Sequence, residues 1–162
     1  MGFWEDHAAD RDGALCRLYQ FDWSTVKRWT DASTPIATSA GDDCGAYFWT
    51  RRPIQSPSGI TSRQSDVGSA TIEMGNADNV ISAILFAGGT AGIQVHIWEA
   101  GFLSTNFSAR PDGVRKIFWG RLKIPSAPRR GDSSVVSFQL GPPFDFNSKM
   151  APIRRLSDLL RA

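Results

Sequence analysis

The sequence has few residues of the kinds that most often carry out catalysis or bind metal ions. Its 162 residues include two cysteines, Cys16 and Cys44, and two histidines, His7 and His96. A Ser-His-Asp arrangement would have to use one of these histidines, and His96 stands in a strand-like segment beside Trp98. None of the four residues is paired at the close spacing of a zinc site. We therefore predict no enzymatic activity, no metal site and no cofactor.

Long apolar runs are also missing. No run approaches the roughly 20 residues that a membrane-spanning helix needs. The first residues, MGFWEDHAADRDG, lack the basic segment and apolar core of a signal peptide. Without a secretory signal, the two thiols are expected to be reduced and buried, not joined in a disulfide.

Turn-forming and aromatic residues are well represented, with 15 Gly, 9 Pro, 10 Phe and 6 Trp. Together with short alternating segments, this composition favours a mainly β domain. The expected strands are residues 15–23, 26–31, 46–54, 69–76, 92–102, 115–124 and 135–141. The first two are expected to form a hairpin, and Pro53 argues against a central strand in the third. The segment 55–66 is expected to be a loop.

Two expected strands carry side-chain predictions. In 92–102, alternation predicts that Ile93, Val95 and Ile97 point inward and that Gln94, His96 and Trp98 point outward. In 115–124 (RKIFWGRLKI), both faces are apolar at the centre, so both faces need to be covered. We expect Phe118 and Leu122 in the subunit's own core, and Trp119 under the helix or at a subunit contact.

One helix is expected within the β domain, over about 77–87. Asn76 or Asp78 can cap its first turn, and Gly88 stands where a left-handed residue ends a helix. Its expected apolar face is made of Val80, Ile81, Ile84 and Leu85.

The chain is expected to divide into a flexible N-terminal arm (1–13), a β domain (14–146) and an amphipathic C-terminal tail helix (147–162). In the tail, an apolar stripe alternates with arginines. The stripe consists of Ile153, Leu156, Leu159 and Leu160.

Charge is distributed unevenly along the chain, although the net charge is only +2. Residues 1–109 contain seven Lys and Arg against twelve Asp and Glu, whereas residues 110–162 contain eleven against four. Either the charges cluster by chance on solvated faces, or the subunit is dipolar and meets its neighbours through acidic and basic surfaces.

The order of several motifs resembles phage tail-tip hub and distal tail proteins. This family includes minor tail protein L of lambda-like phages and related tail proteins of gene transfer agents. The motifs that carry the resemblance are LYQF (18–21), RWTD (28–31), YFWTRRPI (47–54), ITSR (60–63), SATIEMGN (69–76), VHIW (95–98), FWGRLKI (118–124) and VVSFQLGPPFD (135–145). The resemblance spans residues 14–146. The tail APIRRLSDLLRA keeps the family's arginines but lacks its cysteine, so no iron–sulfur site carries over.

The resemblance implies a tail-tube-like β-sandwich or barrel that forms a ring around the DNA channel at the distal end of the tail tube. It implies a structural virion protein, assembled in the bacterial cytoplasm and located in the virion tail. Its partners would be further copies in a six-fold or three-fold ring and the neighbouring tube, hub and tape-measure proteins. DNA would pass through without sequence-specific binding, and no membrane would be involved.

The candidate residues for a subunit or partner interface are aromatic, basic or apolar. They are Trp98, Trp119, Arg121, Arg154, Arg155, Leu156, Leu159 and Leu160. Alternatives are a tail terminator or adaptor protein, a carbohydrate-binding β-sandwich that stacks sugars on Trp49 or Trp98, and a hydrolase with an unfamiliar site.

Overall fold

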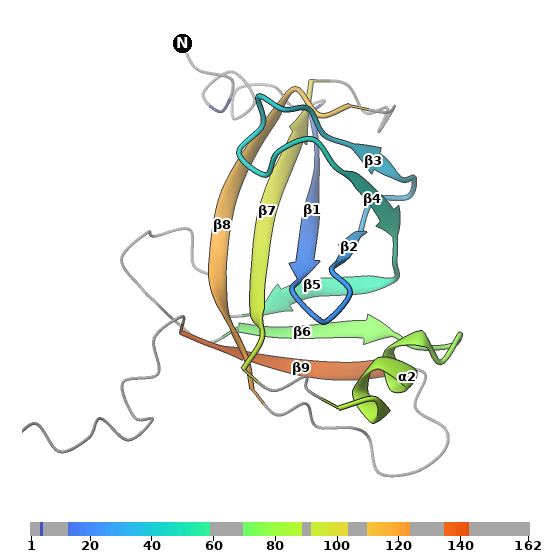
Figure 1. The fold of residues 1–162 in the computed structure, drawn as a ribbon. Helices are drawn as coiled ribbons and strands as arrows, with labels where there is room; N and C mark the ends of the chain where they lie inside the picture. The colour runs from blue at the N-terminus through green and yellow to red at the C-terminus, as the bar shows by residue number, and fades with distance from the viewer. Residues whose placement is uncertain are drawn as a thin grey trace, which may run out of the picture.

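The computed structural model describes Trp4 and residues 13–58, 70–88, 92–103, 110–123 and 135–142, most of them in strands. This confirms a mainly β protein with one embedded helix (Figure 1). The elements are β1 (Ala14–Phe21), β2 (Lys27–Thr30), β3 (Ile36–Ala37), β4 (Phe48–Arg51), β5 (Ile54–Ser58), β6 (Ala70–Gly75), α2 (Val80–Phe86), β7 (Gln94–Phe102), β8 (Gly113–Leu122) and β9 (Val135–Gly141).

The strands form one mixed sheet in the order β3-β4-β2-β1-β7-β8-β9-β6-β5. The expected hairpin of β1 and β2 is present, and the β2–β4 pair is the parallel one among the described strands. The two edge strands, β3 and β5, do not pair with each other, so the sheet is not closed into a barrel.

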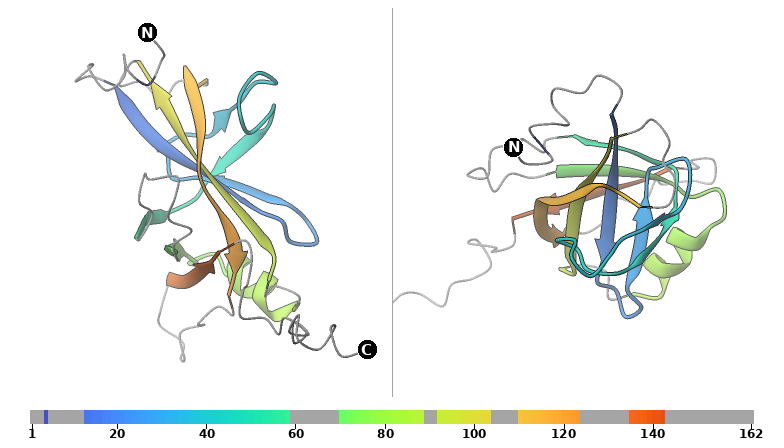
Figure 2. Two further views of the ribbon diagram at one scale, coloured as in Figure 1. Left: turned by 90° about the vertical axis from the view of Figure 1, so that its left-hand side faces the viewer. Right: turned by 90° about the horizontal axis from the view of Figure 1, so that it is seen from above.

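The sheet turns sharply between β8 and β9. These strands pair through only two residue pairs, Arg121 with Gly141 and Leu122 with Leu140. Beyond this corner, β9, β6 and β5 run across the lower halves of β1, β7 and β8 (Figures 1 and 2). Gly120 permits the close approach, because a Cβ atom there would collide with the carbonyl oxygen of Gly141.

Two apolar clusters fill the opposite faces of the long strands. The lower core contains Tyr19, Phe21, Trp23, Trp29, Ala70, Ile72, Met74, Ile81, Val95, Ile97, Leu122, Val136, Phe138 and Leu140. The upper core contains Cys16, Leu18, Ala32, Ile36, Cys44, Trp49, Trp98, Ala100 and Phe102. Strands β1 and β7 contribute to both, because alternate side chains of a strand point to opposite faces. The segment that covers the upper core is residues 36–49, which we call the covering segment.

A bulge in β8 explains why this strand is apolar on both faces. Lys116 lies opposite Trp98, whereas Phe118 lies opposite Ile97, so Ile117 is an additional residue. Without this residue, Phe118 would share the face of Lys116. With it, Phe118 faces the lower core. Leu122 is buried in the lower core and Phe118 packs against it, as the sequence predicts.

Helix α2 begins three residues later and ends one residue earlier than expected. Asn76 Oδ1 accepts hydrogen bonds from the amides of Ile81 (3.1 Å) and Ser82 (3.2 Å), and Asp78 Oδ1 accepts one from Val80 (3.3 Å). Gly88 follows the helix with φ of +81°, the predicted left-handed residue.

Three side-chain or strand predictions are wrong. Trp98 is buried, because the covering segment lies over the face that alternation assigned to solvent. Val80 is exposed, although its predicted partner Ile81 is fully buried. The first part of the expected 55–66 loop continues as β5, which pairs with β6.

The C-terminal tail helix lies outside the described residues, as does the N-terminal arm before residue 13 apart from Trp4. None of the described helical segments is long and apolar enough to cross a membrane.

Candidate functional site

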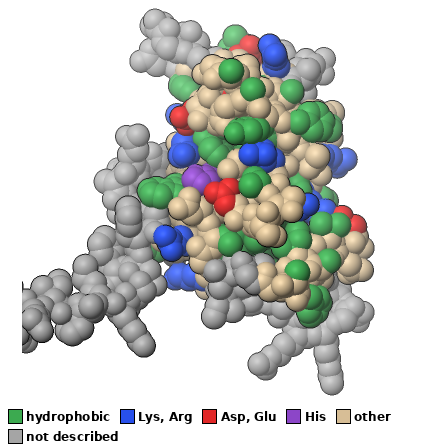
Figure 3. Space-filling model, in the orientation of Figure 1, with side chains coloured by type: hydrophobic (Ala, Val, Ile, Leu, Met, Phe, Trp, Pro, Cys, Tyr) green, Lys and Arg blue, Asp and Glu red, His purple; other side chains and the backbone are tan. Residues whose placement is uncertain are grey.

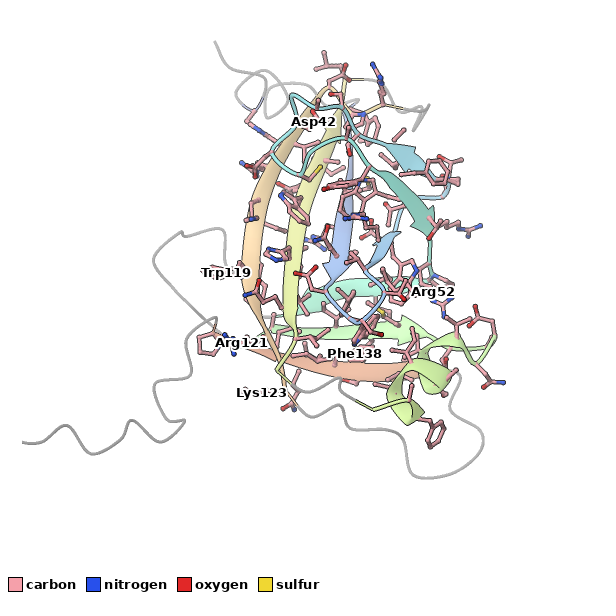
Figure 4. All side chains as sticks on the ribbon, viewed as in Figure 1. Asp42, Arg52, Trp119, Arg121, Lys123 and Phe138 are labelled. Atoms are coloured by element: carbon pink, nitrogen blue, oxygen red, sulfur yellow. The ribbon has the colours of Figure 1, made fainter. Side chains whose placement is uncertain are left out.

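The candidate interface residues of the described chain lie on β7 and β8. Trp119 is 38% exposed and Arg121 is exposed, whereas Trp98 is only 4% exposed and belongs to the upper core. Trp119 does not lie under α2: Figure 4 shows it at the β8 side of the molecule, away from the helix. The remaining candidates, Arg154, Arg155, Leu156, Leu159 and Leu160, lie outside the described residues.

A row of four side chains crosses the sheet just below the covering segment. Trp119 pairs with His96, His96 with Gln20, and Gln20 with Arg28, so the row runs over β8, β7, β1 and β2. Cross-strand partners share a face, and this face is opposite to the lower core. We call these residues the cross-strand row.

The aromatic end of the row is a stack of nearly parallel rings. The centroids of His96 and Trp119 are 6.5 Å apart, with an angle of 11° between the rings. His96 also stacks on the buried Trp98, at 5.6 Å and 22°. The half-exposed indole of Trp119 is therefore supported from the core of the protein.

The other end of the row is a chain of polar contacts. Gln20 donates a hydrogen bond from Nε2 to Asp22 Oδ1 (2.8 Å) and accepts one at Oε1 from Arg28 Nε (2.9 Å). The Arg28 guanidinium lies 3.6 Å from the ring centroid of Tyr47, a residue of the covering segment. The row therefore contacts the covering segment through Arg28 and Tyr47.

His96 is the titratable residue at the centre of the row. Its Nε2 lies 3.4 Å from Asp22 Oδ2, and its Nδ1 is buried with no hydrogen-bond partner among the described residues. Burial lowers the pKa of His96, and the charge of Lys116 lowers it further, while Asp22 opposes both. We assign a neutral imidazole at pH 7 with its proton on Nε2, facing Asp22.

Basic side chains surround this site. Lys116 Nζ lies 5.1 Å from the ring centroid of Trp98, and Arg121 follows Trp119 on the same face of β8. Figure 3 shows the same face with a histidine beside acidic and hydrophobic side chains and with basic side chains around them. Acidic side chains lie here as well: Asp22 contacts His96, and Asp43 Oδ2 accepts a hydrogen bond from the Lys116 amide (2.9 Å).

A second surface lies between the β1–β2 hairpin and α2. It contains an open groove of about 350 Å³, lined by Trp23, Ser24, Thr25, Lys27, Ala83, Ile84, Ala87 and Gly88. Three exposed apolar side chains belong to the same two elements: Val26 in the hairpin, and Val80 and Phe86 on α2. Phe86 is 91% exposed. We call the groove and these three residues the hairpin–α2 patch.

The two thiols do not form a reactive site. Cys16 and Cys44 are free and buried in the upper core, as the sequence predicts. Burial raises the pKa of Cys16 to about 12 and also raises the pKa of Cys44, so both remain protonated at neutral pH.

The carboxyl group of Asp31 is engaged within the fold. It accepts hydrogen bonds from the Arg17 amide (2.7 Å) and the Tyr19 hydroxyl (3.3 Å), and burial raises its pKa. These bonds hold the end of β2 against β1. In the part of the chain that the structure describes, no three His, Cys, Asp or Glu side chains are grouped as a metal site.

Sequence reasoning located Trp119 and Arg121 but missed Gln20, Asp22 and Arg28. The two halves of the row are more than sixty residues apart in the chain, and only the register of β1 against β7 joins them.

Neither the comparison with protein-family models nor the search of curated proteins finds a match to this chain.

Proposed function

We propose that the protein is a structural component of a bacteriophage or phage-like tail, which forms a ring at the distal end of the tail tube and connects it to the tail tip. The order of motifs supports this proposal, as does a mainly β fold with one embedded helix. The two crossing parts of the sheet enclose the lower core in the manner of a two-layer β-sandwich, which is the architecture we propose for the domain.

The hairpin–α2 patch is the observation that carries an assembly role. A phenylalanine that is 91% exposed, beside a groove whose lining includes Trp23, Ala83 and Ile84, is costly to leave in water. Burial against another copy of the chain removes this cost, and apolar contacts of this kind form the centre of most subunit interfaces.

The proposed ring has six or three copies, and it contacts tube, hub and tape-measure proteins. The C-terminal residues Arg154, Arg155, Leu156, Leu159 and Leu160 remain proposed contacts with these neighbours. DNA passes through the ring without sequence-specific contacts. Assembly takes place in the bacterial cytoplasm, and the mature location is the virion tail.

The test is assembly of purified protein, measured by mass photometry and negative-stain microscopy, together with incorporation into tails. Wild-type protein is expected to form rings or to enter tails. Phe86→Ser should abolish both, whereas Phe48→Ser, which changes an exposed phenylalanine on β4, should not. A wild-type chain that stays monomeric and is absent from purified virions would sink the proposal.

The carbohydrate-binding alternative cannot use the two tryptophans that first suggested it. Trp49 is fully buried and Trp98 nearly so, and neither presents a ring face to a ligand. Trp119, by contrast, is 38% exposed.

A further inference from the structure

We propose that the groove of the hairpin–α2 patch binds the C-terminal segment of the next copy of the chain in the ring, residues 152–161 (PIRRLSDLLR), as an amphipathic helix. This deepens the proposed assembly role and rests on it. Three features support the proposal: apolar residues in the lining of the groove, a buried indole N–H group without a partner, and the apolar stripe of the segment.

The groove lies between two short elements that both present apolar side chains. Trp23 contributes to its lining from the hairpin, and Ala83 and Ile84 contribute from α2. Phe86, on the same helix, is 91% exposed. Apolar side chains on either side of an open groove form a surface that can receive the apolar face of an amphipathic helix.

The indole N–H group of Trp23 needs a hydrogen-bond acceptor. Trp23 is only 7% exposed, and its Nε1 is buried with no hydrogen-bond partner among the described residues. Its ring is fixed in the lower core, where it stacks on Phe21 with the ring centroids 4.7 Å apart. A buried donor without an acceptor is destabilising, and an occupant that brings an oxygen atom to the indole removes this cost. We therefore expect an occupant with both apolar and hydroxyl side chains.

The C-terminal sequence has both kinds of side chain at helical spacing. Ile153, Leu156 and Leu160 stand at positions i, i+3 and i+7, the spacing with which helices anchor in apolar grooves. In such a helix, Ser157 borders the apolar stripe, so its hydroxyl oxygen can accept the hydrogen bond from the Trp23 indole. The opposite face carries arginines, which stay available for neighbouring tail proteins.

Ring symmetry favours this segment over a contact between two patches. Two identical patches that face each other form a two-fold dimer and leave no surface for a third copy. A ring of three or six copies needs two different surfaces on each chain, here the groove and the segment. Strand β9 ends at Gly141, and residues 142–152 can extend over about 36 Å, so the segment can reach another subunit.

The proposed contact depends on apolar burial and not on charge. Lys27 is the charged residue in the lining of the groove, and residues 147–162 contain four Lys and Arg against one Asp. Because these charges do not attract each other, added salt should not weaken binding. This separates the proposed contact from unspecific binding of a basic peptide to acidic surfaces.

The first experiment measures binding of a fluorescent peptide of residues 147–162 to the full chain by anisotropy. The chain carries Leu156→Asp and Leu159→Asp, which keep its own segment out of the groove. We expect saturable binding that salt does not weaken, and Ala83→Glu in the groove should weaken it by about tenfold or more. Gln139→Glu is the matched control, because it adds the same charge at an exposed position of β9.

Removal of the indole N–H group tests the hydrogen bond separately. Trp23→Phe keeps an aromatic ring in the lower core and should weaken peptide binding several-fold. A peptide with Ser157→Ala should lose as much, and both changes together should cost no more than either alone. Additive effects would overturn the hydrogen bond. Absence of saturable binding, equal binding by Ala83→Glu, or loss of binding in salt would overturn the docking site.

The second experiment asks whether the segment binds a neighbouring subunit. The chain with Leu156→Asp and Leu159→Asp keeps the groove, whereas the Ala83→Glu chain keeps the segment. Each alone should be monomeric by light scattering after size exclusion, and a mixture should form a heterodimer and nothing larger. Rings of the first variant, or a mixture that stays monomeric, would overturn the inference. Absence of the wild-type chain from rings and virions would count against the proposed function instead, because the peptide titration requires neither.

Discussion

At the scale of single residues, the surroundings of His96 change its pKa and so make the stability of the fold depend on pH. Burial and the charge of Lys116 lower its pKa, and Asp22 only partly opposes them. The unfolded chain therefore binds a proton at this residue at a higher pH than the folded chain does. Stability from His96 is present above about pH 6.5, the ordinary histidine pKa, and is lost as pH falls through the lowered folded-state pKa.

The variant His96→Gln should remove this pH dependence. We expect the difference in free energy of unfolding between wild type and variant to be larger at pH 7.5 than at pH 5, as measured by urea denaturation. His7→Gln, which changes the chain's other histidine, is the control. An equal difference at both pH values would show that the pKa of His96 is not lowered.

At the scale of elements, α2 depends on a side chain outside the helix. Asn76 is buried, accepts hydrogen bonds from two helix amides, and donates one to the Ser82 hydroxyl (2.6 Å). Asn76→Ala should cost about 1–2 kcal/mol in the free energy of unfolding, because the amides lose their acceptor. Asn79 has a φ of +56°, so Asn79→Gly should be neutral or stabilising. Equal destabilisation by the two variants in thermal unfolding would contradict this account.

The bulge of β8, also a feature of a single element, sets which side chains of the strand face the lower core. Deletion of Ile117 would restore regular alternation and turn either Phe118 or Lys116 to the wrong face. We expect the deletion to prevent cooperative folding, observed as loss of the near-ultraviolet circular dichroism of the aromatic cores. Ile117→Val keeps the register and should retain that signal. A folded deletion variant of near wild-type stability would show that the bulge does not set the register.

The sequence predicts elements whose determinants are local and misses those that depend on distant partners. Alternation correctly places Val95 and Ile97, because both face a single core. The same rule misplaces Trp98, since its cover comes from a segment some fifty residues earlier in the chain. The cross-strand row could not be predicted for the same reason, because the sequence of one strand does not determine its register against a strand far away in the chain.

At the scale of the whole molecule, the two cores are joined by shared strands. Neighbouring residues of β1, Leu18 and Tyr19, point into different cores, and so do Ile97 and Trp98 of β7. Loss of either core would release strands that the other needs. The described β structure is thus expected to unfold as a unit, even though its apolar side chains form two separate clusters.

One substitution in each core tests this cooperativity. Trp49→Phe removes upper-core volume and the indole hydrogen bond to Thr38 (3.1 Å), and Phe138→Leu removes lower-core volume. Each is expected to cost about 1 kcal/mol or more. Each should lower the midpoint of one shared transition, seen equally by tryptophan fluorescence and far-ultraviolet circular dichroism. If the cores were independent, Trp49→Phe would shift one of two separable transitions and leave the other at its wild-type midpoint.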